Sequence, residues 1–492
     1  MRPYEQGSGV TPMEQRDARL VAKPSTETST HSAESLWGYS RLGLIRTVAQ
    51  TRPTERFTSL VHLFNVPNLR RAFQELDGTR APGIDRVTKD QYRKDLENHL
   101  VALEKRLRDG SYRPKPSRQV LIPKPQGGMR PLAIGCLQDK LVQTLMARIL
   151  EAVFDPLFST RSYGFRRDKT AHQAVGRLYE SIVQCQQTGV VVEMDIEKFF
   201  DSMNQPWLMR QVESRIVDPK LLRLLSILLR ADVLKEGVAH PTELGTPQGS
   251  PVSPILANIY LHFLLDEWFD ENFSHSGRMV RYADDAAFVF KSSAAAQKFR
   301  QALISRMAEA GLKLNLDKSG IVPFSRHSPK GTVAFLGFEL YWGRTAGQAK
   351  VLKLKTQPKR LSRSMSAFTD WIKTHRNRMK LDKLWRLAAT KLRGHFNYYG
   401  VRSNSPKLAY FYHHCVGALF KWLNRRSQKR SFTWERFERR LFFHPLPRIR
   451  YAQDLRDVSS EHNAVKHKPK SRMREIRTSG SVRSASQKLV FT

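Results

Sequence analysis

The stretch Met279 to Phe290, MVRYADDAAFVF, places two adjacent carboxylates, Asp284 and Asp285, between two apolar runs. The flanking residues have strand composition and Asp tolerates tight-turn geometry, so the stretch predicts a strand, a two-residue turn at Asp284-Asp285 and a second strand. Unpaired carboxylates repel each other and resist burial. The stretch therefore indicates that a cation is held at the end of a hairpin.

A third carboxylate follows another strand-like run. GVVVEMDI, Gly189 to Ile196, is β-branched and reads as a buried strand that ends on Asp195. Asp195 and Asp284 are 89 residues apart in sequence, but two strands can bring them to one edge of a sheet. Such oxygen ligands suit Mg²⁺, and two ions about 4 Å apart can support phosphoryl displacement. The alternative is that each Asp only caps a turn.

Composition favours a folded protein with a polyanionic partner. The chain has 492 residues, 40% of them hydrophobic, and a formal net charge of +38. Residues 341–492 hold 36 Lys and Arg against 8 Asp and Glu, a net charge of +28, which leaves +10 for the first 340 residues. So much positive charge is typical of nucleic-acid binding, although a solvated basic surface is the simpler alternative.

Several other classes of protein are disfavoured by the sequence. The three cysteines, Cys136, Cys185 and Cys415, have neither zinc-module nor disulfide spacing. The polar N-terminal residues lack the apolar core of a signal peptide, and no stretch approaches the length of a membrane span. We expect a soluble, cytoplasmic protein with a disordered lead over residues 1–39.

The middle of the chain alternates predicted strands and helices, which indicates an α+β fold. Residues 40–107 have helical periodicity, and RQVLIPKPQGGMRPLAI is strand-like around a Pro- and Gly-containing loop. A helix is predicted to begin near Ser253, and another over residues 293–310 with Phe299, Leu303, Ile304 and Met307 on one side. LKLNL and VAFLGFELYW are expected strands, and residues 357–443 are expected to be helical.

Taken together, these blocks resemble the group II intron reverse transcriptase/maturase family. YADD lies between apolar strands and is preceded by MDIEKFFDSMN and GTPQGSPVSPILANIYLH. APGIDRVT, IPKPQGGMRPLAI, RSYGFRRDKTAHQAV, LKLNLDKSGIV, FLGFEL and LRGHFNYYGV follow the same family order over roughly residues 40–445. A lone YADD would be weak, whereas so many ordered blocks make coincidence improbable.

The resemblance implies a right-hand polymerase with specific site residues. Fingers and palm would occupy residues 40–345, the palm being an antiparallel sheet packed on helices, and a helical thumb/maturase domain residues 346–445. Catalysis would rest on Asp195, Asp284 and Asp285, with Mg²⁺ bound by Asp195, Asp284 and the Ile196 carbonyl. The nucleotide-binding residues would be Lys124, Arg130, Phe200, Gln248, Gly249 and Lys318. Phe200 would exclude a 2′-hydroxyl, with core packing as its alternative role.

The implied partners are nucleic acids and deoxynucleoside triphosphates. Intron RNA would contact Arg393, Arg425, Arg426, Lys429 and Arg430, and a DNA target would supply the primer. The basic tail, residues 446–492, has no Cys, so we expect DNA binding there without the zinc-dependent endonuclease of longer family members. A dimer is left open, and no membrane partner is expected.

Three functions compete at this point. The first is an RNA-directed DNA polymerase that also assists splicing of its intron. The second is a maturase that binds RNA and has lost polymerisation, which the intact Asp195, Asp284 and Asp285 disfavour. The third is another bacterial reverse transcriptase of retron or defence type, which the long fingers segment and LRGHFNYYGV disfavour.

Overall fold

The computed structural model describes residues 39, 41–123, 128–185, 189–242, 244–327, 331–426, 433–449 and 451. Its helices are α3 (Leu42–Thr51), η1 (Val61–Leu63), α4 (Val66–Glu75), α5 (Lys89–Arg93), α6 (Leu96–Arg108), α7 (Leu137–Phe154), η2 (Asp155–Leu157), α8 (Ala171–Gln184), α9 (Phe199–Ser202), α10 (Gln205–Glu213), α11 (Pro219–Leu229), α12 (Ser253–Leu261), η3 (His262–Asp266), α13 (Glu267–Asn272), α14 (Ser293–Glu309), α15 (Pro358–His375), α16 (Leu381–Tyr399), η4 (Arg402–Asn404), α17 (Ser405–Leu423) and α18 (Trp434–Phe443). Its strands are β1 (Ser117–Pro123), β2 (Met129–Ile134), β3 (Val190–Met194), β4 (Val233–Lys235), β5 (Val238–His240), β6 (Gly277–Tyr282), β7 (Asp285–Phe290), β8 (Ile321–Pro323), β9 (Val333–Phe335), β10 (Phe338–Arg344) and β11 (Lys350–Thr356). The mixture of helices with sheets agrees with the α+β expectation.

The sheet that carries the acidic residues has the strand order β6-β7-β3-β8. All of its neighbouring strands are antiparallel. β3 lies between two strands and is buried along most of its length, which explains its β-branched sequence and confirms the predicted buried strand. The predicted strand LKLNL is wrong: within residues 312–316 only Leu314 makes a bridge, to Ile196, and β8 begins at Ile321.

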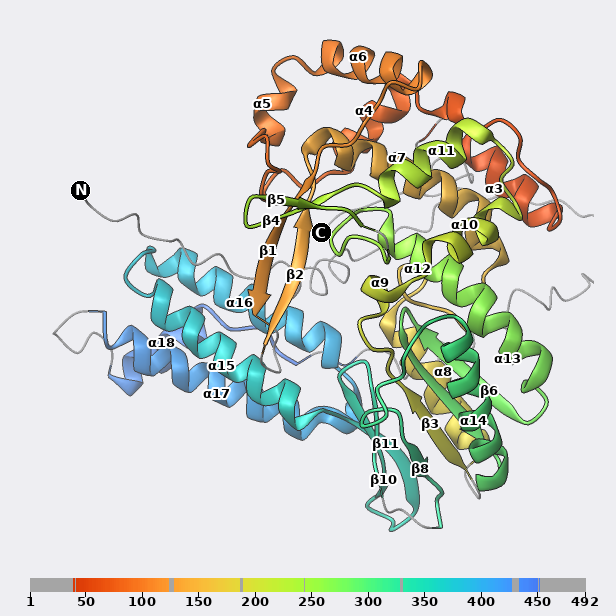
Figure 1. Ribbon diagram of the computed structural model, residues 1–492. Coiled ribbons are helices and arrows are strands. Elements are labelled where there is room, and N and C mark those ends of the chain that lie inside the picture. The colour runs from red at the N-terminus through yellow and green to blue at the C-terminus, as the bar shows by residue number, and fades with distance from the viewer. Residues whose placement is uncertain are drawn as a thin grey trace, which may run out of the picture.

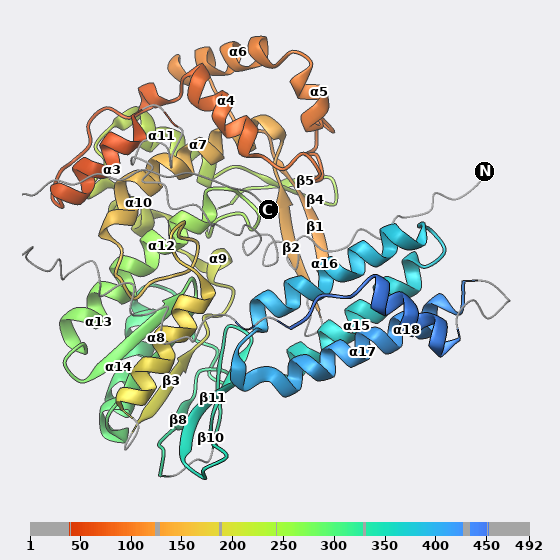
Figure 2. The same cartoon turned by 180° about the vertical axis from the view of Figure 1, so that it is seen from behind.

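Helices cover both faces of this sheet. Because side chains alternate along a strand, Met279 and Phe288 face one core, which contains α12 and α14, whereas Val280 and Val289 face another, which contains α8. Figures 1 and 2 show α8 and α14 lying along the sheet. α14 begins after the N-cap Ser292 and buries the predicted Phe299, Leu303 and Met307. Ile304, predicted on the same side, is instead exposed.

The N-terminal half adds a second helical layer and a separate sheet. α7 is buried along most of its length and packs against α3, α4 and α12. β1 and β2 form the antiparallel hairpin expected around the Pro- and Gly-containing loop, and β4 joins β1 in parallel. In both ribbon views this hairpin points from the upper helices toward α15 and α16 (Figures 1 and 2).

The C-terminal part is helical, as expected from residue 357 onward. A small antiparallel sheet of order β11-β10-β9 precedes it. α15, α16, α17 and α18 enclose their own apolar core, which includes Leu361, Phe396 and Phe437. They form a helical layer beside the β1–β2 hairpin (Figure 1). None of the described helices is both long and apolar enough to cross a lipid bilayer.

Candidate active site

The hairpin turn lies one residue earlier than predicted. Tyr282 pairs with Asp285, so Ala283 and Asp284 form the turn and Asp285 is the first residue of β7. Ala283, rather than an Asp, has positive φ, at 56°. A Cβ on Gly164 would lie 2.2 Å from the Ala283 nitrogen, so the glycine of the RSYGF block permits close packing behind the turn. Asp is the more familiar residue at positive φ, and the prediction followed that preference.

The strand register brings the third carboxylate to the same place. Met194 pairs with Ala286 in the antiparallel β3–β7 ladder. Asp195 is the next residue and therefore continues toward the level of Asp285, beside the turn. Two strands that are far apart in sequence thus place Asp195, Asp284 and Asp285 at one sheet edge, as the sequence predicted.

The acidic side chains influence one another electrostatically. Desolvation raises the pKa of Asp284, and the negative charge of Asp195 raises it further. Desolvation, followed by the charges of Asp284 and Asp195, raises the pKa of Asp285 to about 7. The Asp285 residue is nevertheless exposed, so water screens part of this repulsion. An electrostatic cost of this kind at a surface turn is typical of a functional site.

Basic side chains from three other segments surround the carboxylates. Lys318 Nζ lies 3.1 Å from Asp195 Oδ2. Arg130 in β2 opposes the rise in the pKa of Asp284, and Arg360 in the first turn of α15 does the same for Asp285. Lys318 and Arg130 were predicted to bind the nucleotide or primer, whereas Arg360 was missed. The β1–β2 hairpin, the segment before β8 and the C-terminal helices therefore all contribute positive charge to one region.

The oxygen donors suit a Mg²⁺ ion that substrate phosphates and water help to bind, rather than a metal ion bound by protein side chains alone. Among the described residues, no three His, Cys, Asp or Glu side chains are gathered closely enough to hold a metal by themselves. Mg²⁺ is commonly held by one or two carboxylates together with substrate phosphates and water. Asp195 and Asp284, whose mutual repulsion a cation would relieve, are suitable donors of this kind. Ile196 is buried directly beside Asp195.

A buried arginine supports the turn from behind. Arg281 is fully buried, and its Nε and Nη2 donate to the two carboxylate oxygens of Asp266 at 2.7 and 2.5 Å. Its Nη1 donates to the carbonyl oxygen of Ala283 at 3.0 Å and to Asn258 Oδ1 at 3.1 Å. Burial would raise the pKa of Asp266, but the charge and hydrogen bonds of Arg281 hold that pKa below its usual range. The turn that carries Asp284 is therefore fixed to a buried ion pair.

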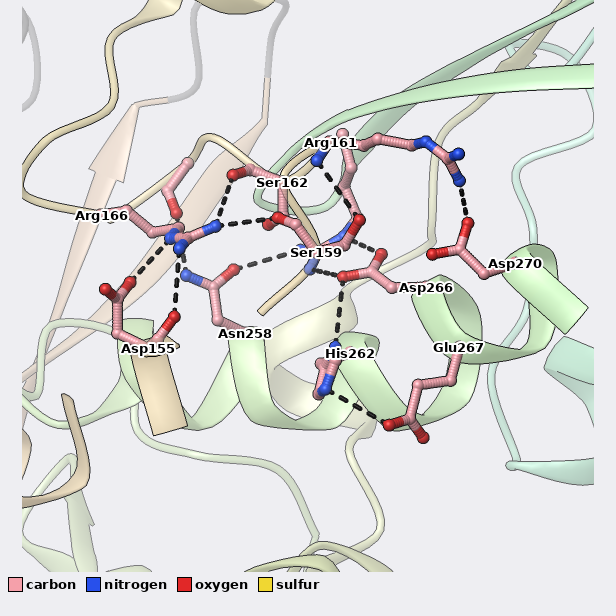
Figure 3. Close-up of polar contacts among 12 residues, drawn as sticks. Asp155, Ser159, Arg161, Ser162, Arg166, Asn258, His262, Asp266, Glu267 and Asp270 are labelled. Carbon is pink, nitrogen blue, oxygen red and sulfur yellow. Dashed lines mark hydrogen bonds and ion pairs between the residues drawn. The ribbon is translucent and has the colours of Figure 1, made fainter. Parts of the chain in front are cut away.

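The RSYGFRR block is part of the same support. Ser162 bridges in parallel to Arg281, so this segment lies along the edge of β6. Asn258 Nδ2 donates to the Gly164 carbonyl at 2.8 Å, and Arg166 Nε donates to Asp155 Oδ1 at 2.7 Å. Figure 3 shows Arg166 and Asp155 on one side of Asn258 and Asp266 on the other. The block thus positions the β6–β7 hairpin, a role that its motif alone did not reveal.

The predicted nucleotide-pocket residues lie in two segments that touch. Gln248 Nε2 donates to the Asp201 carboxylate at 3.0 and 3.1 Å, and the Gln248 carbonyl accepts from the Ala133 amide of β2 at 2.8 Å. Gly249 has φ of 106°, and a Cβ there would lie 2.8 Å from Leu132 Cδ1. The backbone at Gly249 therefore makes the close approach that was expected, but the segment it approaches is β2.

The predicted sugar-selecting residue is partly packed. Phe200 follows Asp195 by five residues and lies 5.6 Å, ring to ring, from Phe199 and 6.5 Å from Phe165. Its carbonyl accepts from the Thr246 amide at 2.7 Å, which ties it to the Gln248 loop. Because Phe200 is only half-buried and Phe165 is exposed, part of the ring surface remains available to a ligand.

The remaining predicted residues are in the C-terminal helices or outside the described residues. Arg393 is exposed on α16, and Arg425 lies 5.0 Å from the Trp422 ring. Arg426 donates to the Met379 carbonyl at 2.9 Å, so it links the segment after α17 to the connection between α15 and α16. Lys124, Lys429 and Arg430 lie outside the described residues.

Sequence reasoning missed Arg281, Arg360 and Asp201. Arg281 stands in the opening hairpin, and a charge flanked by buried strand residues was an available signal. Asp201 lies within the MDIEKFFDSMN block. Arg360 had no signal, because only tertiary packing brings α15 toward Asp285.

Comparison with known proteins agrees with this geometry. The model of the reverse transcriptase (RNA-dependent DNA polymerase) family matches residues 122–340, which include the hairpin and Asp195. Protein YkfC of Escherichia coli (strain K12) is 31% identical over 361 residues, which are 66% of this chain and 93% of YkfC.

Two further relatives are encoded by introns. The group II intron-encoded protein LtrA of Lactococcus lactis subsp. cremoris is 33% identical over 218 residues, which are 44% of this chain and 36% of LtrA. The putative COX1/OXI3 intron 1 protein of Saccharomyces cerevisiae is 34% identical over 223 residues, which are 44% of this chain and 26% of that protein. The alignments thus span about a third or less of these two relatives. Through its family match and its similarity to YkfC and the intron proteins, the chain belongs to the reverse transcriptase (RNA-dependent DNA polymerase) family, and within it to the group II intron reverse transcriptases and maturases.

Proposed function

We propose that the chain copies its own group II intron RNA into DNA during intron mobility and assists splicing of that RNA. The observation that carries this proposal is the convergence of Asp195 with Asp284 and Asp285, where desolvation and then the neighbouring negative charges raise the pKa of the last two. Nucleotidyl transfer needs such a set of oxygen donors beside a nucleic-acid-binding surface.

The proposed layout is that of a right-hand polymerase. Residues 40–345 form fingers and palm, with the β6-β7-β3-β8 sheet as the palm floor. Residues 346–445 form the helical thumb/maturase part, and the basic tail, residues 446–492, contacts the DNA target. Support for this division comes from the separate apolar core of the C-terminal helices. The protein would act in the cytoplasm, with deoxynucleoside triphosphates and a DNA primer as substrates.

At the palm, Asp195, Asp284 and the Ile196 carbonyl would hold Mg²⁺, with Asp285 beside them. Mg²⁺, when bound, lowers the pKa of the primer hydroxyl and neutralises phosphate charge. Lys318, now paired with Asp195, is free to turn toward a phosphate once a cation replaces it, because its side chain is half-exposed. The carboxylates thus set where the reacting phosphate lies.

The nucleotide would be held by residues from the fingers and the adjoining loop. Arg130 and Lys124 would bind its triphosphate, Arg by a two-bond fork and Lys as a point charge. Gln248 and Gly249 would line the pocket, and the exposed part of Phe200 would meet the sugar. The Asp201–Gln248 hydrogen bonds support this arrangement, since they fix the amide that lies beside Phe200.

Intron RNA would bind chiefly along the C-terminal helices. Four cations, Lys373, Arg376, Lys421 and Arg425, lie 5.0–5.9 Å from the Trp422 ring centroid. Such a concentration of positive charge around an aromatic ring suits phosphate contacts with an adjacent base or sugar. Arg393, Arg426, Lys429 and Arg430 would extend this surface.

Two assays on one preparation test the proposal. We expect wild-type protein to extend a DNA primer on an RNA template in Mg²⁺ and to accelerate splicing of the intron RNA. Asp195→Ala should lose extension and keep splicing, because RNA folding requires charge and shape but not the palm carboxylates. A wild-type protein that splices without extending primers would favour the maturase that has lost polymerisation. Extension without splicing would favour a reverse transcriptase of another type.

A further inference from the structure

A basic cavity lies at the end of the β6–β7 hairpin opposite to the catalytic turn. Its volume is about 190 Å³. It is bounded by the C-terminal half of α8, the connection from α13 to β6, and the outer ends of β6 and β7. Its lining residues are Arg161, Arg177, Ser181, Cys185, Ser274, His275, Ser276, Gly277, Arg278, Met279, Val289 and Lys291. We refer to it as the hairpin-base pocket.

Positive charge in this pocket exceeds the negative charge that neutralises it. Arg161 pairs with Asp270, as Figure 3 shows, and Arg177 pairs with Glu180 at 3.0 Å. Arg278 and Lys291, in contrast, have no carboxylate within ion-pair distance in the described part of the chain. Desolvation, then Arg177 and Arg278, lower the pKa of Arg161. An anion in the pocket would relieve this repulsion.

The neutral residues of the lining indicate which chemical group the pocket can bind. Ser181, Ser274 and Ser276 supply hydroxyl donors beside the arginines. Among the described lining residues, His275 has the only aromatic ring, and no Phe, Tyr or Trp offers a larger surface on which a base can stack. Three hydroxyl groups and three guanidinium groups, against one imidazole ring, suit a phosphate group better than a base.

The position of the pocket separates it from the proposed active site. Arg278 precedes Tyr282, the last residue of β6, by four residues, and a strand advances about 3.4 Å per residue, so roughly 14 Å of strand lies between Arg278 and the turn. Arg278 also lies on the sheet face that packs on α8, together with Val280. A phosphate bound there belongs to nucleic acid outside the few base pairs next to the growing primer end.

We propose that the hairpin-base pocket binds a phosphodiester group of a nucleic-acid backbone, as a second contact for long nucleic acid beyond the primer terminus. The pocket would bind the phosphodiester through positive charge and hydroxyl donors, so this binding would not depend on the base sequence. The placement of this contact beyond the primer terminus rests on the proposed polymerase function, whereas phosphate binding in the pocket does not.

The test compares two charge-matched double variants. R278Q/K291Q removes the two pocket cations that have no carboxylate partner among the described residues, and K220Q/R223Q removes two exposed cations on α11, which lies among the upper helices in Figure 1, away from α8 and β6. Binding of a labelled RNA hairpin, and of a DNA hairpin of the same sequence, is measured by fluorescence anisotropy over a KCl series. We expect R278Q/K291Q to weaken binding several-fold and to lower the log–log salt slope by up to about two, because each lost phosphate contact withholds nearly one counterion.

The outcomes separate the alternatives. A reduced salt slope confined to R278Q/K291Q supports phosphate binding in the pocket. Whichever probe loses more affinity, the RNA hairpin or the DNA hairpin, identifies the nucleic acid whose phosphate the pocket binds. An unchanged slope in a folded R278Q/K291Q protein, or an equal reduction in K220Q/R223Q, overturns the proposal.

Extension of a short primer–template by R278Q/K291Q should stay at the wild-type rate. A matching loss there would place the pocket on the primer–template path and overturn a separate contact. If the wild-type protein fails to extend primers, the proposed polymerase function fails while the binding result stands.

Discussion

Asp284 and Asp285 lie where desolvation and neighbouring negative charge disfavour their ionised forms. Desolvation raises the pKa of both, followed by the negative charge of Asp195 for Asp284 and the charges of Asp284 and Asp195 for Asp285. Lys318 compensates Asp195, but across a half-exposed ion pair that a bound cation can replace. Residues with such uncompensated charge are expected where a substrate or metal completes the site.

Arg281 is expected to act as a positioning residue. R281K keeps a positive charge but loses the two-bond fork to Asp266 and the donor to the Ala283 carbonyl. We expect kcat for nucleotide addition to fall about 10–100-fold with little change in KM for the nucleotide, because a small displacement of Asp284 suffices. Steady-state kinetics on an RNA template measure both constants.

A double substitution distinguishes positioning from stability. R281M/D266L removes both buried charges, which often restores stability lost when one partner of a buried ion pair is removed. We expect R281M/D266L to melt close to the wild-type temperature yet to keep the low kcat. Wild-type kcat in that variant would show that Arg281 serves folding alone.

Phe200 is expected to select the sugar of the nucleotide. F200A removes the ring surface that remains exposed beside Phe165. We expect the ratio of ribonucleotide to deoxyribonucleotide incorporation to rise roughly 10–100-fold, the effect of a steric block worth a few kcal/mol. Single-nucleotide incorporation assays measure the ratio, with F200Y as the control that keeps the ring. An unchanged ratio in F200A would assign Phe200 to core packing.

At the scale of elements, the β6–β7 hairpin has a turn that carries repelling carboxylates and two strands that are tightly packed. The turn is fixed by a buried arginine behind it and by Gly164 packed against its backbone. The strands themselves are paired with β3 and buried between helices. Such support keeps repelling carboxylates at one edge without a loss of local order.

The repulsion predicts how stability depends on pH and Mg²⁺. A carboxyl whose pKa is raised on folding stabilises the protein at low pH, and this stabilisation is lost as pH rises through about 7 for Asp285. We expect Mg²⁺ to raise the melting temperature by about 2 °C or more at pH 8 and by less at pH 5.5, where the carboxyls hold protons. Differential scanning fluorimetry measures both values.

A matched variant makes this stability prediction specific. D285N should raise the melting temperature of the metal-free protein at pH 8 and reduce the Mg²⁺-dependent increase. An equal Mg²⁺ effect in wild-type protein and D285N at both pH values would mean that the ion acts elsewhere.

The hairpin also shows what sequence can and cannot supply at this scale. Alternating composition located β6 and β7, and the β-branched run located β3, because buried strands have few acceptable compositions. The turn was displaced by one residue because residue preference favoured Asp over Ala at positive φ, whereas packing of Gly164 decided the geometry. LKLNL alternates like a strand but pairs only through Leu314, which local pattern cannot reveal.

On the scale of the whole molecule, distant segments supply a single site. The acids come from β3 and the hairpin turn, and the surrounding cations from β2, the segment before β8, and α15. Ordered motifs predicted the acids and two of the cations. Arg360 was not predictable, because a basic residue in a helix with many basic residues has no local feature that marks it.

The uneven charge is likewise a property of the whole chain. The net charge of +28 over residues 341–492 lies largely outside the acidic sheet, and it surrounds Trp422 with cations. Under the proposed function, RNA is held by one part of the protein while another part performs chemistry. Variants of the acids should therefore leave RNA affinity nearly unchanged, which makes them clean tests of catalysis.

The most direct test is the rate at which one deoxynucleotide is added to a DNA primer on an RNA template, measured by rapid quench for wild-type protein, D195N and D284N. The two Asp residues come from segments 89 positions apart, yet we predict that either substitution lowers the rate by at least about three orders of magnitude while primer–template binding persists. Near-wild-type rates in either well-folded variant would contradict the account, because the carboxylates would then not form one catalytic site.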